Sequence, residues 1–117
     1  MSNECIVEAQ VLYDAHFYSG SISRNYHVVF NAIRAALESK EMPVRPHKKA
    51  LPLFHQHFIK TGIFKREIKD IPKYLKEAHI DVDYKANTNL SEPDAKRALM
   101  SARQFYDAVK NYVDAEN

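Results

Sequence analysis

The chain has 117 residues, with 17 basic and 15 acidic side chains, and its net charge is therefore only +2. This length predicts a single domain over residues 1–117, large enough to bury a core without a metal or a disulfide. Because the charges nearly balance, composition excludes nucleic-acid binding through overall charge, and such a ligand would need a local basic patch.

Cysteine content and the N-terminal sequence predict the compartment. Cys5 is the only cysteine, so an internal disulfide is excluded and a reducing compartment is favoured. Residues 1–8 contain acidic groups where a secretory signal peptide needs basic ones. No apolar run approaches the roughly 20 residues that a membrane span requires. We therefore expect a cytoplasmic protein with no membrane partner.

The spacing of apolar residues predicts an all-α fold. Apolar positions recur at intervals of three and four, and only Gly20 and Gly62 interrupt the pattern as glycines. A first helix is expected over residues 3–18, followed by a tight turn at residues 19–21 that makes the next helix an antiparallel neighbour. The first helix should direct inward Ile6, Val7, Val11, and Ala15 or Tyr18.

The predicted second helix follows this turn, ends within residues 39–43, and has two distinct faces. The positions that share one apolar sector are Ile22, Tyr26, Val29, Phe30, Ile33 and Leu37. The opposite side gathers Arg24, His27, Asn31, Arg34 and Glu38. This polar face is either a solvated surface in which Arg34 and Glu38 pair at i,i+4, or a polar cleft or subunit contact.

An extended link with two prolines precedes a predicted third helix. This helix should begin near His47 or Ala50 and end at Thr61, with Gly62 as its C-terminal stop. Because proline is tolerated in a first turn but not in a helix interior, Pro52 places the regular helix close to Ala50 or introduces a kink.

Two further helix starts follow. Asp70 and Pro72 predict a short fourth helix, and residues 80–90 then form a polar loop. Ser91 and Asp94 have the spacing of an acidic capping box before a long last helix. The inward positions are Ile71, Leu75 and Ala78 in the fourth helix, and Ala95, Leu99, Ala102, Phe105 or Tyr106, Val109 and Val113 in the last. The predicted architecture is an antiparallel up-and-down bundle of four to five helices.

Several sequence blocks stand in a particular order along the chain. They are Ser-Arg-Asn-Tyr-His-Val-Val-Phe-Asn-Ala-Ile-Arg-Ala-Ala-Leu at 23–37, His-Lys-Lys-Ala-Leu-Pro-Leu-Phe at 47–54, Phe-Ile-Lys-Thr-Gly at 58–62, and Asp-Tyr at 83–84 before a helix with Ala95 and Ala102. In this order they resemble blocks of the HEPN domain family: Ser-Arg-x-Tyr-Tyr-Ala-x-Phe-x-Ala-x-x-Ala-Leu-Leu, His-Lys-x-(four residues)-Phe, Phe-x-Lys-x-Gly, and an Asp-Tyr element before the final helix. The resemblance is greatest to small stand-alone members encoded beside minimal nucleotidyltransferases in prokaryotes.

This resemblance implies a homodimeric helical bundle that acts in one of two settings. One setting is partnership with a minimal nucleotidyltransferase, and the other is RNA cleavage by a toxin, defence or stress protein. The ribonuclease members carry an Arg followed after four to six residues by a His, and the motifs of two subunits meet at the dimer cleft. None of the six arginines here has a His at that distance, since only two residues separate Arg24 from His27.

We therefore predict a non-enzymatic HEPN binding protein, the partner of a minimal nucleotidyltransferase in a toxin–antitoxin or defence-type system, with a nucleotide as a candidate ligand. The alternative is a HEPN ribonuclease toxin that cleaves RNA without a metal. Arg24, His27 and Asn31 are the first candidates for binding, because a permanent cation, a group that titrates near neutrality and an amide suit a phosphate. Arg24 and His27 are also the candidates for catalysis, as cation and base.

Four further residues complete the predicted site. His47 and Lys48, with Lys49, are candidate phosphate contacts, and the alternative for His47 is packing at a helix start. Asp83 and Tyr84 are candidates for a nucleotide or partner contact, and loop hydrogen bonding is the alternative. The six histidines lack the spacing of metal ligands. We therefore expect neither a metal nor a cofactor.

Overall fold

The computed structural model describes residues 3–45, 47–84 and 91–116, and within them it contains five α-helices and no strand. The helices are α1 (Glu4–Asp14), α2 (Tyr18–Ser39), α3 (His47–Phe54), α4 (Ile71–Tyr84) and α5 (Glu92–Glu116). A π-helical turn, His55–Ile59, follows α3, and a 3-10 turn, Arg66–Ile68, precedes α4. The predicted all-α fold is confirmed. No helix of the described residues is long and apolar enough to cross a membrane.

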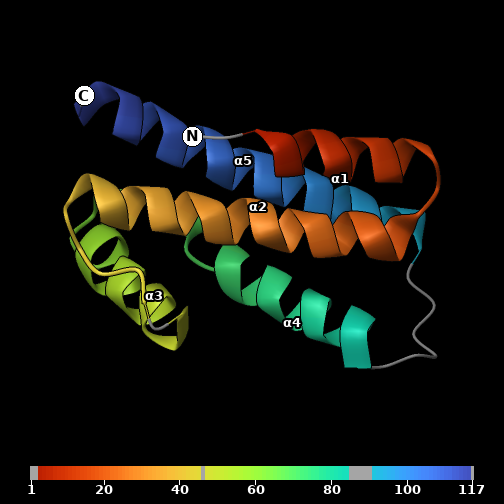
Figure 1. Cartoon of the computed structure of the whole chain (residues 1–117), viewed down its shortest axis with the longest axis horizontal. Helices are drawn as coiled ribbons and strands as arrows, with labels where there is room; N and C mark the ends of the chain where they lie inside the picture. Colours follow the sequence, from red (N-terminus) through yellow and green to blue (C-terminus); the bar gives the residue numbers. More distant parts are fainter. Residues whose placement is uncertain (1–2, 46, 85–90, 117) are drawn as a thin grey trace.

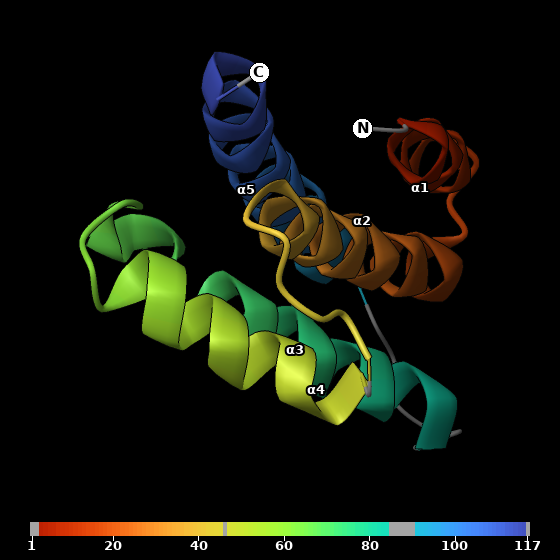
Figure 2. The same ribbon diagram turned by 60° about the vertical axis from the view of Figure 1, so that its left-hand side comes forward.

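The central helix of the bundle is α2, which packs against each of the other four helices. In Figure 1, α1 and α5 lie on one side of α2, and α3 and α4 lie on the other. The colour order shows that α1 and α4 run in one direction and that α2 and α5 run in the opposite one. Figure 2 shows the same separation, with α3 and α4 together on the side of α2 opposite α1. The antiparallel bundle is therefore confirmed.

The core forms where α2 meets the other helices. The predicted inward positions of α2 are buried at Ile22, Val29, Ile33 and Leu37 and half-buried at Tyr26 and Phe30. Beside them lies an aromatic cluster with ring centroids between 5.2 and 5.7 Å apart, made of Phe54, Phe58, Phe64, Phe105 and Tyr112. Each such aromatic pair contributes about 0.5–1.5 kcal/mol beyond its buried area. This cluster holds α3 and its π-helical turn against α5.

The turn between α1 and α2 corrects the prediction. We expected it at residues 19–21, but α1 ends at Asp14 and α2 already begins at Tyr18. His16 has φ +66°, so a residue other than glycine takes the left-handed conformation that ends the first helix. Gly20 instead lies within α2, where Leu12 of α1 approaches to 3.5 Å from the position that a Cβ atom would occupy.

The inward face of α1 also differs from the prediction. Val7 and Val11 were expected inside, yet they are 53% and 59% exposed. The buried residue is Ala9, whose carbonyl oxygen accepts a hydrogen bond of 2.8 Å from Ser21 Oγ. Ile6 is half-buried against the core, as expected. Because α1 lies at the edge of the bundle, it buries only a narrow strip and leaves the two valines outside.

The third helix begins at His47, one of its two predicted starts, but its regular part ends at Phe54. Pro52 lies inside α3 and has no N–H to donate within the helix. Beyond Phe54 the helix widens, and Lys60 N–H donates to the carbonyl of His55 at 2.9 Å, an i→i+5 hydrogen bond. Gly62 has φ +78°, as its predicted role as a C-terminal stop requires.

The starts of α4 and α5 are confirmed. α4 begins at Ile71, directly after Asp70 and with Pro72 in its first turn. The predicted loop over residues 80–90 is wrong for residues 80–84, because α4 continues to Tyr84, and residues 85–90 lie outside the described part of the chain. Before α5, Ser91 donates from both Oγ and N–H to Asp94 Oδ2, at 2.9 and 3.1 Å. These bonds lower the pKa of the Asp94 carboxyl.

The predicted inward positions of the last two helices are also mostly buried. These positions fall into two groups that differ in burial. The buried positions are Ile71 and Leu75 in α4 and Ala95, Ala102, Phe105, Tyr106 and Val109 in α5, and the half-buried ones are Ala78, Leu99 and Val113. Helical spacing therefore predicts this part of the core correctly.

Candidate functional site

The polar face predicted for the second helix lies on the outer surface of α2. Four of its five side chains are exposed, namely those of Arg24, His27, Asn31 and Glu38. The side chain of Arg34 is half-buried. We call these five residues the α2 stripe. Within the described residues no ion pair joins Arg34 to Glu38, so the solvated i,i+4 pair that we considered is absent. Within the stripe, Arg24 and His27 contact different neighbouring helices, and Asn31, Arg34 and Glu38 line a cleft.

Arg24 contacts α1. Its Nε atom lies 3.3 Å from Glu8 Oε2, and the two side chains are 45% and 48% exposed. An ion pair this exposed contributes little to stability, between about 0 and 1 kcal/mol. The pairing does hold the guanidinium over the α1–α2 seam, where solvent and a partner can still reach it.

His27 contacts the opposite neighbour, α4. Its ring centroid lies 5.7 Å from that of His79, with the two planes at 68°. His79 in turn stacks on Tyr26, with centroids 4.4 Å apart and planes 2° apart, and a hydrogen bond of 3.2 Å joins its Nδ1 to Ser23 Oγ. Burial raises the pKa of the Tyr26 phenol, which keeps that group neutral. Arg24 and His27, the two candidates for catalysis, are therefore held by helices on different sides of α2.

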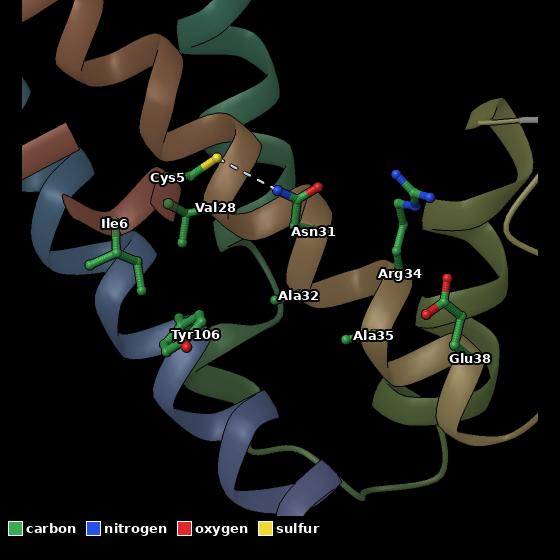
Figure 3. Close-up of a pocket in the computed structure, with 9 residues that line it drawn as sticks. All are labelled: Cys5, Ile6, Val28, Asn31, Ala32, Arg34, Ala35, Glu38 and Tyr106. Carbon is green, nitrogen blue, oxygen red and sulfur yellow. Dashed lines mark hydrogen bonds between the residues drawn. The ribbon is translucent and has the colours of Figure 1, made fainter. Parts of the chain in front are cut away.

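A cleft opens beside the stripe, at the N-terminal end of α1. Its volume is about 230 Å³. Figure 3 shows that Cys5 and Ile6 enter it from α1, Tyr106 enters from α5, and the remaining lining residues come from α2. Asn31 Nδ2 donates to Cys5 Sγ at 3.6 Å across its edge. Because α1 starts opposite Asn31, it leaves the following turns of α2 uncovered, and Arg34 lies in that open part.

Of the site candidates whose side chains are described, Asn31 lines this cleft, whereas Arg24, His27 and Lys48 do not. His47 and Lys48 are the first two residues of α3, and Lys48 is exposed. Asp83 and Tyr84 end α4 rather than standing in the predicted loop. The side chains of His47, Asp83 and Tyr84 lie outside what the structure describes. The structure therefore divides the predicted site between the α2 stripe and the start of α3.

Sequence reasoning missed two neighbours of these candidates. His79 was not expected beside His27, although it lies four residues after Leu75, a predicted inward position, and so follows the same helix face. The lysines in and just before α4 were also missed, although Lys69, Lys73 and Lys76 are spaced four and three residues apart. Among the described residues, no group of three or more His, Cys, Asp or Glu side chains is placed to hold a metal ion.

The fold is that of a small all-α bundle of five helices within the described residues. The profile of the HEPN domain matches residues 1–112. The chain belongs to the HEPN domain family, and the resemblance found in the sequence blocks is confirmed.

Similar proteins occur in archaea and bacteria. The protein named "Putative toxin MJ0142" of Methanocaldococcus jannaschii is 29% identical over 109 residues, which cover 91% of this chain and 72% of that protein. A "UPF0332 protein" of Thermotoga maritima is 24% identical over 113 residues, which cover 97% of this chain and 86% of that protein. "Putative toxin MJ0605" of Methanocaldococcus jannaschii is 21% identical over 113 residues, which cover 94% of this chain and 81% of that protein. The similarity therefore extends over nearly the whole chain.

Proposed function

We propose that this chain is a non-enzymatic HEPN protein that forms a homodimer and binds a minimal nucleotidyltransferase in a toxin–antitoxin or defence-type system. Membership of the HEPN family supports a role of this kind, and two similar proteins carry the word toxin in their names. The α2 stripe is the proposed contact surface for the nucleotidyltransferase.

The observation that supports this proposal is that Arg24 and His27 contact different neighbouring helices. Metal-free RNA cleavage needs a cation and a base at the same phosphate. In this chain the Arg24 guanidinium is paired with Glu8 of α1, whereas His27 lies against His79 of α4. Such an arrangement suits an extended contact surface better than a cleavage site within one subunit.

Affinity purification of the tagged protein from its own host tests the proposal. Mass spectrometry of the bound proteins should find a nucleotidyltransferase in stoichiometric amount, and the eluate should leave added RNA intact. Light scattering of the purified chain should give the mass of a dimer. Arg24→Glu should remove the nucleotidyltransferase, because it reverses a charge within the proposed surface.

Two control variants separate contact from folding. Arg103→Glu makes the same charge change on an exposed part of α5 and should retain the partner. Glu8→Gln removes the ion pair that joins α1 to α2 but leaves the Arg24 cation in place, so it should also retain the partner. Loss of binding in Glu8→Gln would assign the effect to displacement of α1 instead of to a direct contact.

The same purification distinguishes the alternative function. If no nucleotidyltransferase is bound, RNA is cleaved, and His27→Ala abolishes that cleavage, then the chain is a HEPN ribonuclease and the proposed partner role is wrong. His79→Ala should be tested in the same RNA cleavage assay, because the His79 ring lies against His27.

A further inference from the structure

The cleft at the N-terminal end of α1 has a lining of mixed chemistry. Four of its lining residues are apolar, namely Ile6, Val28, Ala32 and Ala35. The other five carry polar side-chain atoms: Cys5, Asn31, Arg34, Glu38 and Tyr106. Two of the apolar residues are alanines of α2, whose short side chains leave the space between α2 and α5 open (Figure 3). The cleft therefore offers apolar contact and polar binding groups to the same ligand.

Two of the polar residues carry opposite charges and do not neutralise each other. Arg34 is half-buried and Glu38 is exposed, and they lie one helical turn apart on α2. Their Cβ atoms are therefore about 5–6 Å apart. Among the described residues, neither side chain forms an ion pair with the other or with a third residue. A cation and an anion that lack protein partners thus line one cleft.

The hydroxyl of Tyr106 is a further polar group without a partner. Tyr106 is only 7% exposed, and within the described part of the chain no hydrogen bond joins its hydroxyl to another group. The hydroxyl oxygen is still reached by solvent, since Asn25 Nδ2 is the one sealed side-chain atom without a partner among the described residues. Buried tyrosines usually find a hydrogen-bond partner for this group. Because Tyr106 lines the cleft, a ligand there can supply that partner.

The size and the charge of the cleft restrict the ligand. Its volume is about 230 Å³. This is less than the roughly 300–1,000 Å³ of pockets that hold drug-sized molecules, so the ligand is small. One cation and one anion line the cleft, so Glu38 repels a simple anion and Arg34 repels a simple cation. A small ligand that carries both charges satisfies both residues.

We propose that this cleft binds a free α-amino acid with an aliphatic side chain. The carboxylate of the ligand lies against the Arg34 guanidinium, whose planar fork of donors suits a carboxylate. Its ammonium group lies against the Glu38 carboxylate. Its side chain contacts Ile6 and Val28, and the Tyr106 hydroxyl donates to the ligand carboxylate.

This inference goes beyond the proposed partner role and does not rest on it. The cleft contains three residues of the α2 stripe, namely Asn31, Arg34 and Glu38. Binding of an amino acid is nevertheless measured on the purified chain, with no nucleotidyltransferase present. Either proposal can therefore fail while the other stands.

Titration of the isotopically labelled chain with leucine, followed by two-dimensional amide NMR, tests the inference. The amide signals of Cys5, Asn31 and Ala35 should shift progressively and reach saturation. Leucinamide lacks the carboxylate and N-acetylleucine lacks the ammonium group, so each should bind at least about tenfold more weakly than leucine. Glycine lacks the aliphatic side chain and should also bind at least about tenfold more weakly.

Variants of the charged residues assign the two charged contacts. Arg34→Gln and Glu38→Gln should each weaken leucine binding by at least about tenfold. The matched controls are Arg103→Gln on α5 and Glu77→Gln on α4, which make the same changes at exposed positions outside the cleft. Each control should alter the affinity less than about twofold, because solvent and salt screen these distant charges.

Two further variants test the cleft without removing a charge. Tyr106→Phe keeps the ring and removes the hydroxyl, so it should weaken leucine binding by about three- to tenfold. Ala35→Leu fills the cleft and should weaken binding by at least about tenfold, because overpacking leaves no room for the ligand. Circular dichroism must show that every variant remains helical.

The inference is overturned if the folded protein shows no saturable shifts with leucine, isoleucine or valine, or if the shifts map outside the cleft. Wild-type affinity in both Glu38→Gln and Ala35→Leu would overturn it as well. Equal affinity for N-acetylleucine or for leucinamide would also contradict it, because a ligand with a single charge would then suffice.

Discussion

The two glycines of this chain should respond in opposite ways to replacement by alanine. Gly20 lies inside α2, where a Cβ atom would meet Leu12 Cδ1 at 3.5 Å, an ordinary van der Waals distance. Gly62 has φ +78° with no neighbour within 4 Å of its Cβ position, so conformation alone decides the effect there. Gly20→Ala should therefore stabilise the protein, and Gly62→Ala should destabilise it.

The magnitudes follow from backbone conformation. Alanine is favoured over glycine in a helix by up to about 1 kcal/mol, and Gly20 is only the third residue of α2, so we expect a gain of about 0.5–1 kcal/mol. A non-glycine residue in the left-handed region costs about 1–2 kcal/mol, which is the expected loss for Gly62→Ala. In a domain of this size, 1 kcal/mol shifts the melting temperature by roughly 3–6 °C.

Urea unfolding followed by circular dichroism measures both changes. The midpoint should rise for Gly20→Ala and fall for Gly62→Ala with an unchanged slope against urea. If Gly20→Ala lowered the free energy of unfolding by about 1 kcal/mol or more, about the cost of a lost turn conformation, residues 19–21 would form the turn that the sequence indicated, and the helix start at Tyr18 would be wrong.

Two further predictions concern the core and an ionisable contact. Phe58 is fully buried, so Phe58→Ala should lower the free energy of unfolding in urea by about 3–5 kcal/mol. The control Phe17→Ala changes a side chain that is 64% exposed and should alter this free energy by less than about 0.5 kcal/mol. Equal losses of stability in the two variants would refute this packing of the π-helical turn against α5. Tyr13 donates a hydrogen bond to the Glu92 carboxylate, which with partial desolvation raises the pKa of Tyr13 to about 12. Because the folded-state pKa is raised, the contribution of this contact is complete below about pH 10 and is lost as the pH rises through about 12. Glu92→Gln should return the tyrosinate titration, followed by ultraviolet absorbance, toward the ordinary value of 10.0, and an unchanged titration would contradict the contact.

Local chemistry explains which parts of the fold were predictable. The start of α5 depends on Ser91 and Asp94, which lie three residues apart, and the stop after the third helix depends on one glycine, Gly62. The inward faces of α2 and α5 follow from helical spacing, because these helices are covered along most of their length. Such features need only neighbours in sequence, and the prediction of an all-α bundle rested on them.

The errors at the N-terminus have a tertiary cause. Gly20 was interpreted as a turn residue, but it lies inside α2, where Leu12 of α1 comes within 3.5 Å of the Cβ position. His16 adopts the left-handed conformation at the real turn, and sequence rules rarely assign that conformation to histidine. Val7 and Val11 were placed inside because their spacing is helical, but spacing does not show how much of an edge helix its neighbours cover.

The sequence by itself determined the helices, most of the core, the family and the polar face of α2, because each of these follows from residue types at short spacing. Only the tertiary structure decided how the candidate residues group. It turned Arg24 toward α1 and His27 toward α4, since those helices pack on opposite sides of α2. It also brought Cys5 of α1 and Tyr106 of α5 to one cleft, because α1 and α5 lie on the same side of α2. Side chains this far apart in the chain line one cleft only after the helices have packed.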